Sequence, residues 1–410
     1  MKNRVPLEEL KRVLPGAQLK RLALKHKTDA CNQVRLPGSA VFVSLLDALL
    51  NHGVVTTRLL EELYEQRTGR SADHSSFAAR LQKIPAEYFR EIYSDLHERL
   101  APQASAAEQR ALRVRRADAT VVALSAKLLS WGLSCGNRKK ARAKRQVKAV
   151  WSLEEDGLPS ILRLCKEQSE LSDCVAMGDA ILEHARRADL WVFDQGCHDR
   201  ERLFALHEKG AYWLTPHGQQ ALLGRRTVWE ADPETRPKAE PGKGEPPCWV
   251  ERVEAAHFGN SQETRAKQAQ WAKMPLLVVH LRRWDQRGSK WVPLVLMTNL
   301  PLREEGDGAG PFTWAELAEV YRQRWEIEVL FKFLKQHLGY SHLTSRSENG
   351  CEVMAYMSLI AALLLIWYKR RSGIDRGWKS VRSWFAHDLR GWVEQALRAA
   401  LAPPDPIPAP

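Results

Sequence analysis

The segment from residue 321 to residue 335 constrains this chain most, because it contains no Gly or Pro and its apolar residues recur at helical spacing. It is predicted to be the middle of one long helix. Four of its polar residues are spaced 3, 4 and 7 apart: Tyr321, Arg324, Glu328 and Lys335. At about 100° per residue, these side chains fall within an arc of roughly 60°. The adjoining arc is apolar and holds Ile327, Leu330, Phe331, Leu334 and Leu338.

This polar stripe therefore lies along the edge of a buried helix face. A carboxylate flanked by Arg, Lys and Tyr suits a site that holds a metal ion and binds phosphate. Glu326 is the competing carboxylate, but it points about 160° away from Glu328 on the same helix. The helix geometry therefore favours Glu328. The alternative is a solvated face with ion pairs, each worth a few tenths of a kcal/mol.

Length and charge limit the classes of protein. A chain of 410 residues exceeds the usual size of a single core, so two or three units are expected. The net charge of +13 favours a polyanionic partner, most often nucleic acid. The seven cysteines are scattered without a Cys-x-x-Cys pair, which supports neither a zinc site nor a disulfide framework. They fit a reduced, intracellular protein, and the N-terminus shows no signal peptide.

One apolar run, from Val353 to Tyr368, is short for a membrane span and contains Ser358. We expect a buried core helix there and no membrane partner. Near the N-terminus, short helices are predicted at Ala40–Leu50, at Arg58–Arg67 with Thr57 as cap, and after Ser75. They could form a helix-turn-helix DNA reader or a packing bundle, and the sequence does not separate these two readings.

The pattern changes to short β-like runs from about residue 111. Strands are predicted at Leu112–Leu124, Val147–Leu153 and Ile161–Cys165, followed by a helix over Asp179–Arg187 and a buried strand at Leu190–Phe193. This order of strands, a helix and a further strand matches a ribonuclease-H-like core. In such a core, acidic residues stand on the first strand, on the fourth strand and on a later helix.

The predicted fold class is α/β: a ribonuclease-H-like catalytic core interrupted by a β-rich insertion, with a helical N-terminal domain and a helical C-terminal region. A Pro-, Gly-, Lys- and Glu-rich stretch, 232–247, marks a surface loop of that insertion. The predicted domains are 1–105 (helical, a candidate DNA-binding domain), 106–216 (first part of the core), 217–300 (insertion), 301–375 (second part of the core, with the Glu helix) and 376–410 (helical tail).

Three carboxylates stand out by position: Asp118 in a strand, Asp194 at a strand end, and Glu328 on the helix. Mg²⁺ prefers oxygen ligands and is held by a few carboxylates together with substrate phosphate. Two such ions can activate a water or a 3′-hydroxyl in phosphodiester transfer. For Asp118 alone, a strand-edge carboxylate is the simpler reading, and Asp194 before Gln-Gly is a common turn residue. Their order and spacing together carry the prediction.

A run of cations lies between two strands of the proposed core, with no acidic residue among them. It consists of Arg138, Lys139, Lys140, Arg142, Lys144, Arg145 and Lys148. As a loop it could neutralise several DNA phosphates, whereas the alternative is a solvated loop. Four tryptophans of the insertion, namely Trp249, Trp271, Trp284 and Trp291, are candidates for stacking on an unpaired base.

The Tyr-x-x-Arg-x-x-x-Glu-x-x-x-x-x-x-Lys spacing resembles the signature of DDE transposases of the insertion-sequence 4 family. Ala117-Asp118-Ala119-Thr120 looks like the first-Asp strand of that family, and Val192-Phe193-Asp194-Gln195-Gly196 looks like its second-Asp segment. Leu296-Met297-Thr298-Asn299-Leu300 is also similar to it. Gln195 departs from the family, where an Arg is common at that place. The resemblance covers about residues 112 to 345.

This resemblance implies a cut-and-paste DNA transposase. Asp118, Asp194 and Glu328 would bind Mg²⁺, for which Mn²⁺ can substitute, and Tyr321, Arg324 and Lys335 would hold DNA phosphate. The expected partners are double-stranded DNA, as terminal inverted repeats and target, and a second copy of the chain on paired ends. A cytoplasmic, nucleoid-associated protein is expected. Two alternatives remain open: a ribonuclease-H-like nuclease without strand transfer, and a catalytically inactive, transposon-derived DNA-binding protein.

Overall fold

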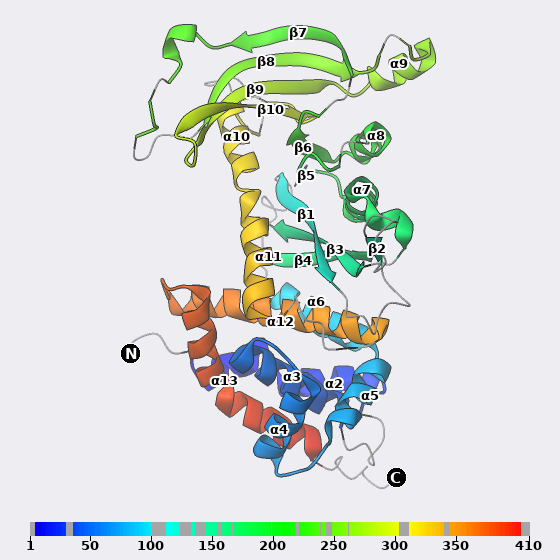
Figure 1. Ribbon diagram of the computed structural model, residues 1–410, viewed down its shortest axis with the longest axis vertical. Coiled ribbons are helices and arrows are strands. Elements are labelled where there is room, and N and C mark those ends of the chain that lie inside the picture. Colours follow the sequence, from blue (N-terminus) through cyan, green and yellow to red (C-terminus); the bar gives the residue numbers. More distant parts are fainter. Residues whose placement is uncertain are drawn as a thin grey trace. The chain divides into compact units, whose positions relative to one another are not determined.

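The computed structural model describes residues 5–29, 36–100, 112–123, 133–135, 144–154, 157–165, 167–197, 199–218, 221–237, 239–242, 248–260, 262–302, 311–339, 345 and 347–402. The chain divides into two compact units. The helical unit comprises Met1–Gln103, Val121–Lys148 and Leu330–Pro410. The sheet unit comprises Ala104–Thr120 and Ala149–Val329. The fold is therefore a mixed α/β structure with one large sheet and many helices (Figure 1).

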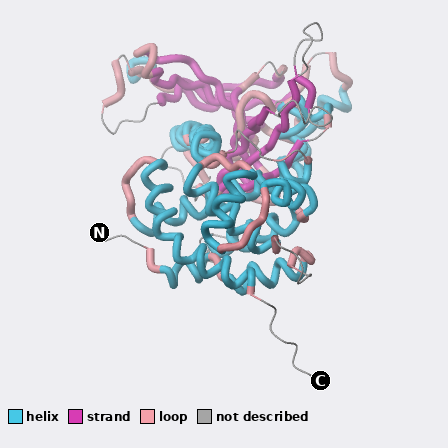
Figure 2. Tube along the Cα trace, turned by 60° about the horizontal axis from the view of Figure 1, so that its bottom comes forward, coloured by secondary structure: helices cyan, strands magenta, loops and turns pink. Residues whose placement is uncertain are grey.

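The helical unit brings together helices from both ends of the chain, drawn in cyan in Figure 2. Helix α3 packs on α13, and α12 packs on α5 and α6. The helices of this unit are α1 (Leu7–Val13), α2 (Gly16–Lys25), α3 (Gly38–His52), α4 (Thr57–Thr68), α5 (His74–Lys83), α6 (Ala86–Leu100), α12 (Glu348–Ser372) and α13 (Trp378–Leu401).

Local sequence explains where these helices begin and end. The Thr56 side chain caps α4 by accepting from the Leu59 N–H at 3.1 Å, so the cap is one residue earlier than predicted. Gly53 ends α3 at φ 74°, a left-handed conformation that favours glycine. Helix α12 is long and apolar enough to cross a membrane, but 89% of its apolar window is buried. The prediction of a buried core helix at Val353–Tyr368 is confirmed.

The described strands form one ten-stranded sheet in the order β2-β3-β1-β5-β6-β10-β9-β8-β7, with β4 paired to β3. Strand β5 is parallel to β1 and to β6, whereas β6, β10, β9, β8 and β7 pair antiparallel in turn. The strands are β1 (Arg113–Ala123), β2 (Leu133–Cys135), β3 (Lys144–Glu154), β4 (Pro159–Cys165), β5 (Asp189–Val192), β6 (Tyr212–Pro216), β7 (Leu222–Glu230), β8 (Cys248–Phe258), β9 (Leu276–Asp285) and β10 (Lys290–Thr298).

The predicted strands agree with β1, β3, β4 and β5. In the insertion, β-like runs of sequence at 227–229, 249–253, 276–284 and 291–297 fall within β7, β8, β9 and β10. The predicted helix at Asp179–Arg187 is shifted: α7 ends at His184, before Ala188 adopts a positive φ of 64°. The remaining helices are α7 (Asp173–His184), α8 (Arg200–Glu208), α9 (Arg265–Trp271), α10 (Trp314–Arg322) and α11 (Trp325–His337), with short 3-10 turns η3 (Gln168–Leu171) and η4 (Pro233–Thr235). Strands β1 and β3 and helix α11 run across the division between the units.

The two faces of the sheet unit have different cores, because successive side chains of a strand point to opposite faces. One face packs Leu190 and Val192 of β5 and Leu214 of β6 against α10. On the other face, Trp191 and Trp213 stand beside each other in register and are fully buried. The α10 face is the one that leads to the candidate site.

Candidate active site

Asp118 and Asp194 come from neighbouring parallel strands. In the register of β1 and β5, Arg116 pairs with Val192; Asp118 lies two residues further along β1, and Asp194 lies two residues beyond Val192, where β5 ends. The two-residue period places Asp118 on the same face as Val114 and Arg116. The sheet therefore presents both carboxylates on the face that α10 covers.

Backbone groups hold both aspartates. The Ala119 N–H donates to Asp118 Oδ1 at 2.7 Å, and the Gly196 N–H donates to Asp194 Oδ1 at 2.8 Å. A Cβ at Gly196 would stand 3.0 Å from that Asp194 oxygen, so glycine permits this close approach. The Thr215 hydroxyl of β6 donates to the Asp194 carbonyl at 3.0 Å.

The prediction of one continuous helix over 321–335 is wrong. Helix α10 ends at Arg322 and α11 begins at Trp325, end to end with it in Figure 1. At the junction, the N–H groups of Arg324 and Glu326 bond to carbonyls three residues back, at 3.0 Å each. This tighter turn needs neither Gly nor Pro, so composition gave no sign of it. Tyr321 thus belongs to α10, Arg324 to the turn and Glu328 to α11.

Arg324 joins two of the three carboxylates. Its Nη2 donates to Glu328 Oε1 at 2.8 Å, and its Nη1 lies 3.7 Å from Asp118 Oδ2. Burial raises the pKa of Asp118 to about 6, and the charges of Asp194 and Glu328 add to the rise while the Ala119 N–H and Arg324 oppose it. Asp118, Asp194 and Glu328 are therefore close enough to share one electrostatic environment.

Glu326 has a different neighbourhood. Its side chain is 55% exposed and lies 3.5 Å from Arg116 Nη1. Arg116 is only 3% exposed, donates to Gln323 Oε1 at 2.7 Å and to the Glu154 carbonyl at 3.3 Å, and so ties β1 to the turn between the helices. The carboxylate of α11 whose charge helps to raise the pKa of Asp118 is that of Glu328. These contacts agree with the prediction, made from helix geometry, that Glu328 and not Glu326 faces the other two carboxylates.

The donor chemistry of the three carboxylates fits a hard divalent cation. Within the described parts of the chain, however, no three acidic, His or Cys side chains converge closely enough to hold one. The guanidinium of Arg324 is the cation that Asp118 and Glu328 share in this arrangement.

The remaining predicted DNA-binding residues are placed less fully. Lys335 is half-buried on the part of α11 that belongs to the helical unit. Arg138, Lys139, Lys140 and Arg142 lie outside the described residues. The prediction of one loop through Lys148 is wrong, because Lys144, Arg145 and Lys148 belong to β3. Lys148 is 3% exposed, so it is buried within the strand and does not lie in an open loop.

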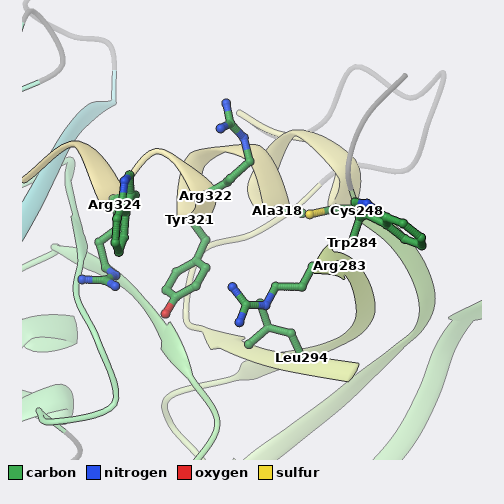
Figure 3. A pocket seen from close by; sticks show the side chains of 9 residues that line it. Cys248, Arg283, Trp284, Leu294, Ala318, Tyr321, Arg322 and Arg324 are labelled. Carbon is green, nitrogen blue, oxygen red and sulfur yellow. The ribbon is translucent and has the colours of Figure 1, made fainter. Parts of the chain in front are cut away.

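A cavity of about 410 Å³ opens between α10 and the strands β8, β9 and β10. Figure 3 shows Tyr321 and Arg283 pointing toward this space and Arg322 pointing away from it. Arg324 lines the cavity as well. Burial raises the pKa of the Tyr321 hydroxyl, so this group remains a neutral hydrogen-bond donor at physiological pH.

Sequence reasoning missed several residues of this region. Arg116 could have been found as a cation two residues before Asp118 on a buried strand face. Arg283 was not singled out, although it follows a run of apolar residues in β9. Of the candidate tryptophans, Trp271 is buried on α9 and cannot stack on a base, whereas Trp284 lines the cavity. Trp325, which is 60% exposed, also lines it.

Comparison with known proteins gives consistent matches. A putative transposase for insertion sequence element IS4SA of a Synechocystis species is 41% identical over 71 residues, 17% of this chain and 20% of that protein. A probable transposase for insertion sequence element IS5377 of Geobacillus stearothermophilus is 31% identical over 90 residues, 21% of this chain and 24% of that protein. The matched stretches thus span about a fifth to a quarter of these curated relatives.

A cryo-EM structure of a piggyBac transposase synaptic complex with hairpin DNA aligns with a TM-score of 0.45 and 8% sequence identity, over 90% of this chain and 73% of that chain. The sequence profile of the transposase DDE domain matches residues 114–364, which is more than half of the chain. The matched range contains Asp118, Asp194 and Glu328. The chain belongs to the transposase DDE domain family.

Proposed function

We propose that this protein is a DNA transposase that cleaves the ends of an insertion sequence and joins them to target DNA by metal-dependent phosphodiester transfer. The observation that carries the proposal is that the Arg324 guanidinium pairs with Glu328 at 2.8 Å and lies 3.7 Å from Asp118. Asp194 is near enough for its charge to add to the rise that burial causes in the pKa of Asp118. Membership of the transposase DDE domain family supports it. Within that family, the chain fits the insertion-sequence 4 type by its Tyr321, Arg324, Glu328 and Lys335 spacing.

The strand order supports a ribonuclease-H-like core as the scaffold of this activity. Strand β1 stands between β3 and β5, β4 pairs with β3, and β6 follows β5 in parallel. The antiparallel strands β7 to β10 extend this sheet between Asp194 and Glu328, as expected of a β-rich insertion. The division into domains at residues 105, 216, 300 and 375 belongs to the same proposal.

In this proposal Asp118, Asp194 and Glu328 hold Mg²⁺, or Mn²⁺ in its place. A bound divalent cation supplies Lewis acidity for activating a water or 3′-hydroxyl and for neutralising the leaving oxygen. The protein orients the carboxylates through the Ala119 and Gly196 N–H groups. Restrained carboxylates keep the reacting groups in place, which lowers the entropic part of the barrier.

Tyr321, Arg324 and Arg283 are proposed to bind the DNA end, since all three line the cavity beside the carboxylates. A guanidinium recognises phosphate with two parallel hydrogen bonds, and a neutral tyrosine can donate a third. Trp284 offers an aromatic surface in the same cavity for an unpaired base. Lys335 is proposed as a further phosphate ligand from its place in the family spacing.

Further DNA contacts are proposed for the cations from Arg138 to Arg145 and for the C-terminal helices. From Lys369 to Arg382 the chain carries six cations and one carboxylate, Asp375. Burial lowers the pKa of His337, and the positive charges of Arg382 and Lys379 lower it further. Action as a homodimer on paired ends, in association with the nucleoid, completes the proposal.

The test is cleavage of the DNA that flanks the gene, with Mg²⁺ or Mn²⁺, by wild type, Glu328→Gln and the matched variant Glu326→Gln. We expect cleavage at the element boundary in wild type and Glu326→Gln, and none in Glu328→Gln, with DNA binding retained in all three. Joined products separate a transposase from a nuclease that only cuts. Binding without any cleavage by wild type would identify an inactive DNA-binding relic and overturn the proposal.

A further inference from the structure

Arg324 stands between the carboxylate site and the cavity. Its Nη atoms contact Glu328 at 2.8 Å and Asp118 at 3.7 Å, and the same side chain lines the cavity that Tyr321 and Arg283 also line. Because the residue lies in the tight turn between α10 and α11, its backbone is fixed on both sides by helix. A change of rotamer is therefore the means by which its charge can move from one place to the other.

The carboxylate site depends on this one cation. The side chains of Arg324 and Asp118 are 15% and 20% exposed, so water screens their charges incompletely. Burial opposes the charge of Arg324, but Tyr321, Glu328 and Asp118 outweigh burial and raise the pKa of the guanidinium. Without a metal ion, Arg324 neutralises charge that a divalent cation would neutralise in the loaded protein.

Its hydrogen bonding is also incomplete. The Nε of Arg324 is buried and has no hydrogen-bond partner among the described residues, although a guanidinium carries five N–H donors. A buried donor left unpaired costs free energy that an added acceptor recovers. Phosphate oxygens are acceptors that suit the guanidinium fork, and Tyr321, whose ring centroid lies 5.9 Å from the Arg324 guanidinium carbon, is a neighbouring donor to the same group.

We propose that Arg324 is a counter-ion exchanged between two ligands: it neutralises Asp118 and Glu328 in the metal-free protein and turns to a DNA phosphate once a divalent cation has neutralised them. The inference rests on the proposed metal and DNA roles of this site, and it adds a coupling between them. Two measurable consequences follow from this exchange. Arg324 competes with the metal ion for the carboxylates, and metal binding strengthens phosphate binding by releasing the guanidinium.

The competition is measured without catalysis, by titrating Mn²⁺ into the DNA-free protein and following the free ion by electron paramagnetic resonance. Arg324→Gln removes the competing charge, and we expect Mn²⁺ to bind roughly tenfold more tightly, the size expected for one nearby, partly screened charge. Arg324→Lys keeps the charge and is expected to bind Mn²⁺ like wild type. Arg322→Gln is the matched control for the loss of one positive charge: Arg322 is two residues away and lines the same cavity, but its guanidinium pairs with Glu319 instead of the site carboxylates.

The coupling is measured with a duplex that carries a pre-cleaved element end, so that nothing remains to be cut. Mn²⁺ is expected to tighten its binding to wild type and to Arg322→Gln by about tenfold, and to change its binding to Arg324→Gln by less than threefold. Thermal unfolding of each variant checks that the fold is intact.

Failure of this inference is distinguishable from failure of the proposed function. Unchanged Mn²⁺ affinity in Arg324→Gln, together with weakened affinity in Asp118→Asn and Glu328→Gln, would overturn the exchange and keep the metal site. Absence of saturable Mn²⁺ binding in wild type, or binding that Asp118→Asn leaves unchanged, would overturn the metal site itself. If Arg324→Lys also bound Mn²⁺ more tightly than wild type, the arginine would act through its shape and not through its charge, and the exchange would be overturned.

Discussion

The two faces of the strands β1, β5 and β6 are built from alternate residues of the same segments, yet they contribute differently to the stability of the fold. On one face Trp191 and Trp213 are fully buried, and Trp213 stacks on Phe258 with ring centroids 6.2 Å apart. On the other face the strands lead to Asp118 and Asp194, where burial raises the pKa of Asp118 to about 6. The first face stabilises the sheet, whereas the second combines apolar packing against α10 with charges whose repulsion lowers stability. Under the proposed function, a bound cation would reduce that repulsion.

The largest expected effect is on activity, at the carboxylate face. Asp118→Asn removes a proposed metal ligand without changing the size of the side chain, and we expect cleavage of flanking DNA to fall about a thousandfold, equivalent to roughly 4 kcal/mol of transition-state stabilisation. Single-turnover cleavage measures it. Residual activity within tenfold of wild type would mean that Asp118 is a structural carboxylate.

The opposite face is tested by Trp213→Ala, which deletes a fully buried side chain. The lost contacts and the cavity should lower the free energy of unfolding by about 3–5 kcal/mol. Trp213→Phe is the matched control. The indole Nε1 is buried and has no hydrogen-bond partner in the described part of the chain, so replacing it removes an unsatisfied donor, and we expect a loss of less than about 1.5 kcal/mol. Urea unfolding measures both. Equal losses would show that the indole shape, rather than buried apolar volume, holds this face together.

Much of the difference between the two faces could be predicted from the sequence. Once the strand positions are known, the two-residue period assigns each side chain to one face. β1, β5 and the choice of Glu328 over Glu326 followed from local patterns. The tight turn at Gln323 and Arg324 could not, because its cause is tertiary: Arg116, on a strand some two hundred residues earlier, donates to Gln323. Likewise Lys148 sits in a cationic run that resembles a loop, but β3 buries it. The cavity combines residues of β8, β9, β10 and α10, and no single segment contains its pattern.

The buried charge of Asp118 should also make the free energy of unfolding depend on pH. A carboxyl whose pKa rises from 3.8 to about 6 on folding binds its proton more tightly in the folded state. The protonated Asp118 carboxyl therefore adds to the free energy of unfolding at pH 4, and this added stability is lost as the pH rises through 6. In the metal-free protein we expect Asp118→Asn to raise the free energy of unfolding at pH 7, by at most about 3 kcal/mol, and to leave it nearly unchanged at pH 4. Urea unfolding at the two pH values decides it, and a destabilised variant at pH 7 would mean that the charge of Asp118 is favourable in the folded protein.

The smallest effect is expected where the charge is exposed. Glu326 lies 3.5 Å from Arg116, but its side chain is 55% exposed, so water screens the pair. Glu326→Gln should change the free energy of unfolding by less than about 1 kcal/mol, and added salt should reduce the difference further. Arg116 keeps its bonds to Gln323 and to the Glu154 carbonyl, which are the contacts that hold β1 to the turn. A loss as large as that of Trp213→Ala would show that Glu326 is needed to neutralise buried Arg116. In that case Glu326, unlike Glu328, would be a carboxylate of α11 that stabilises the fold.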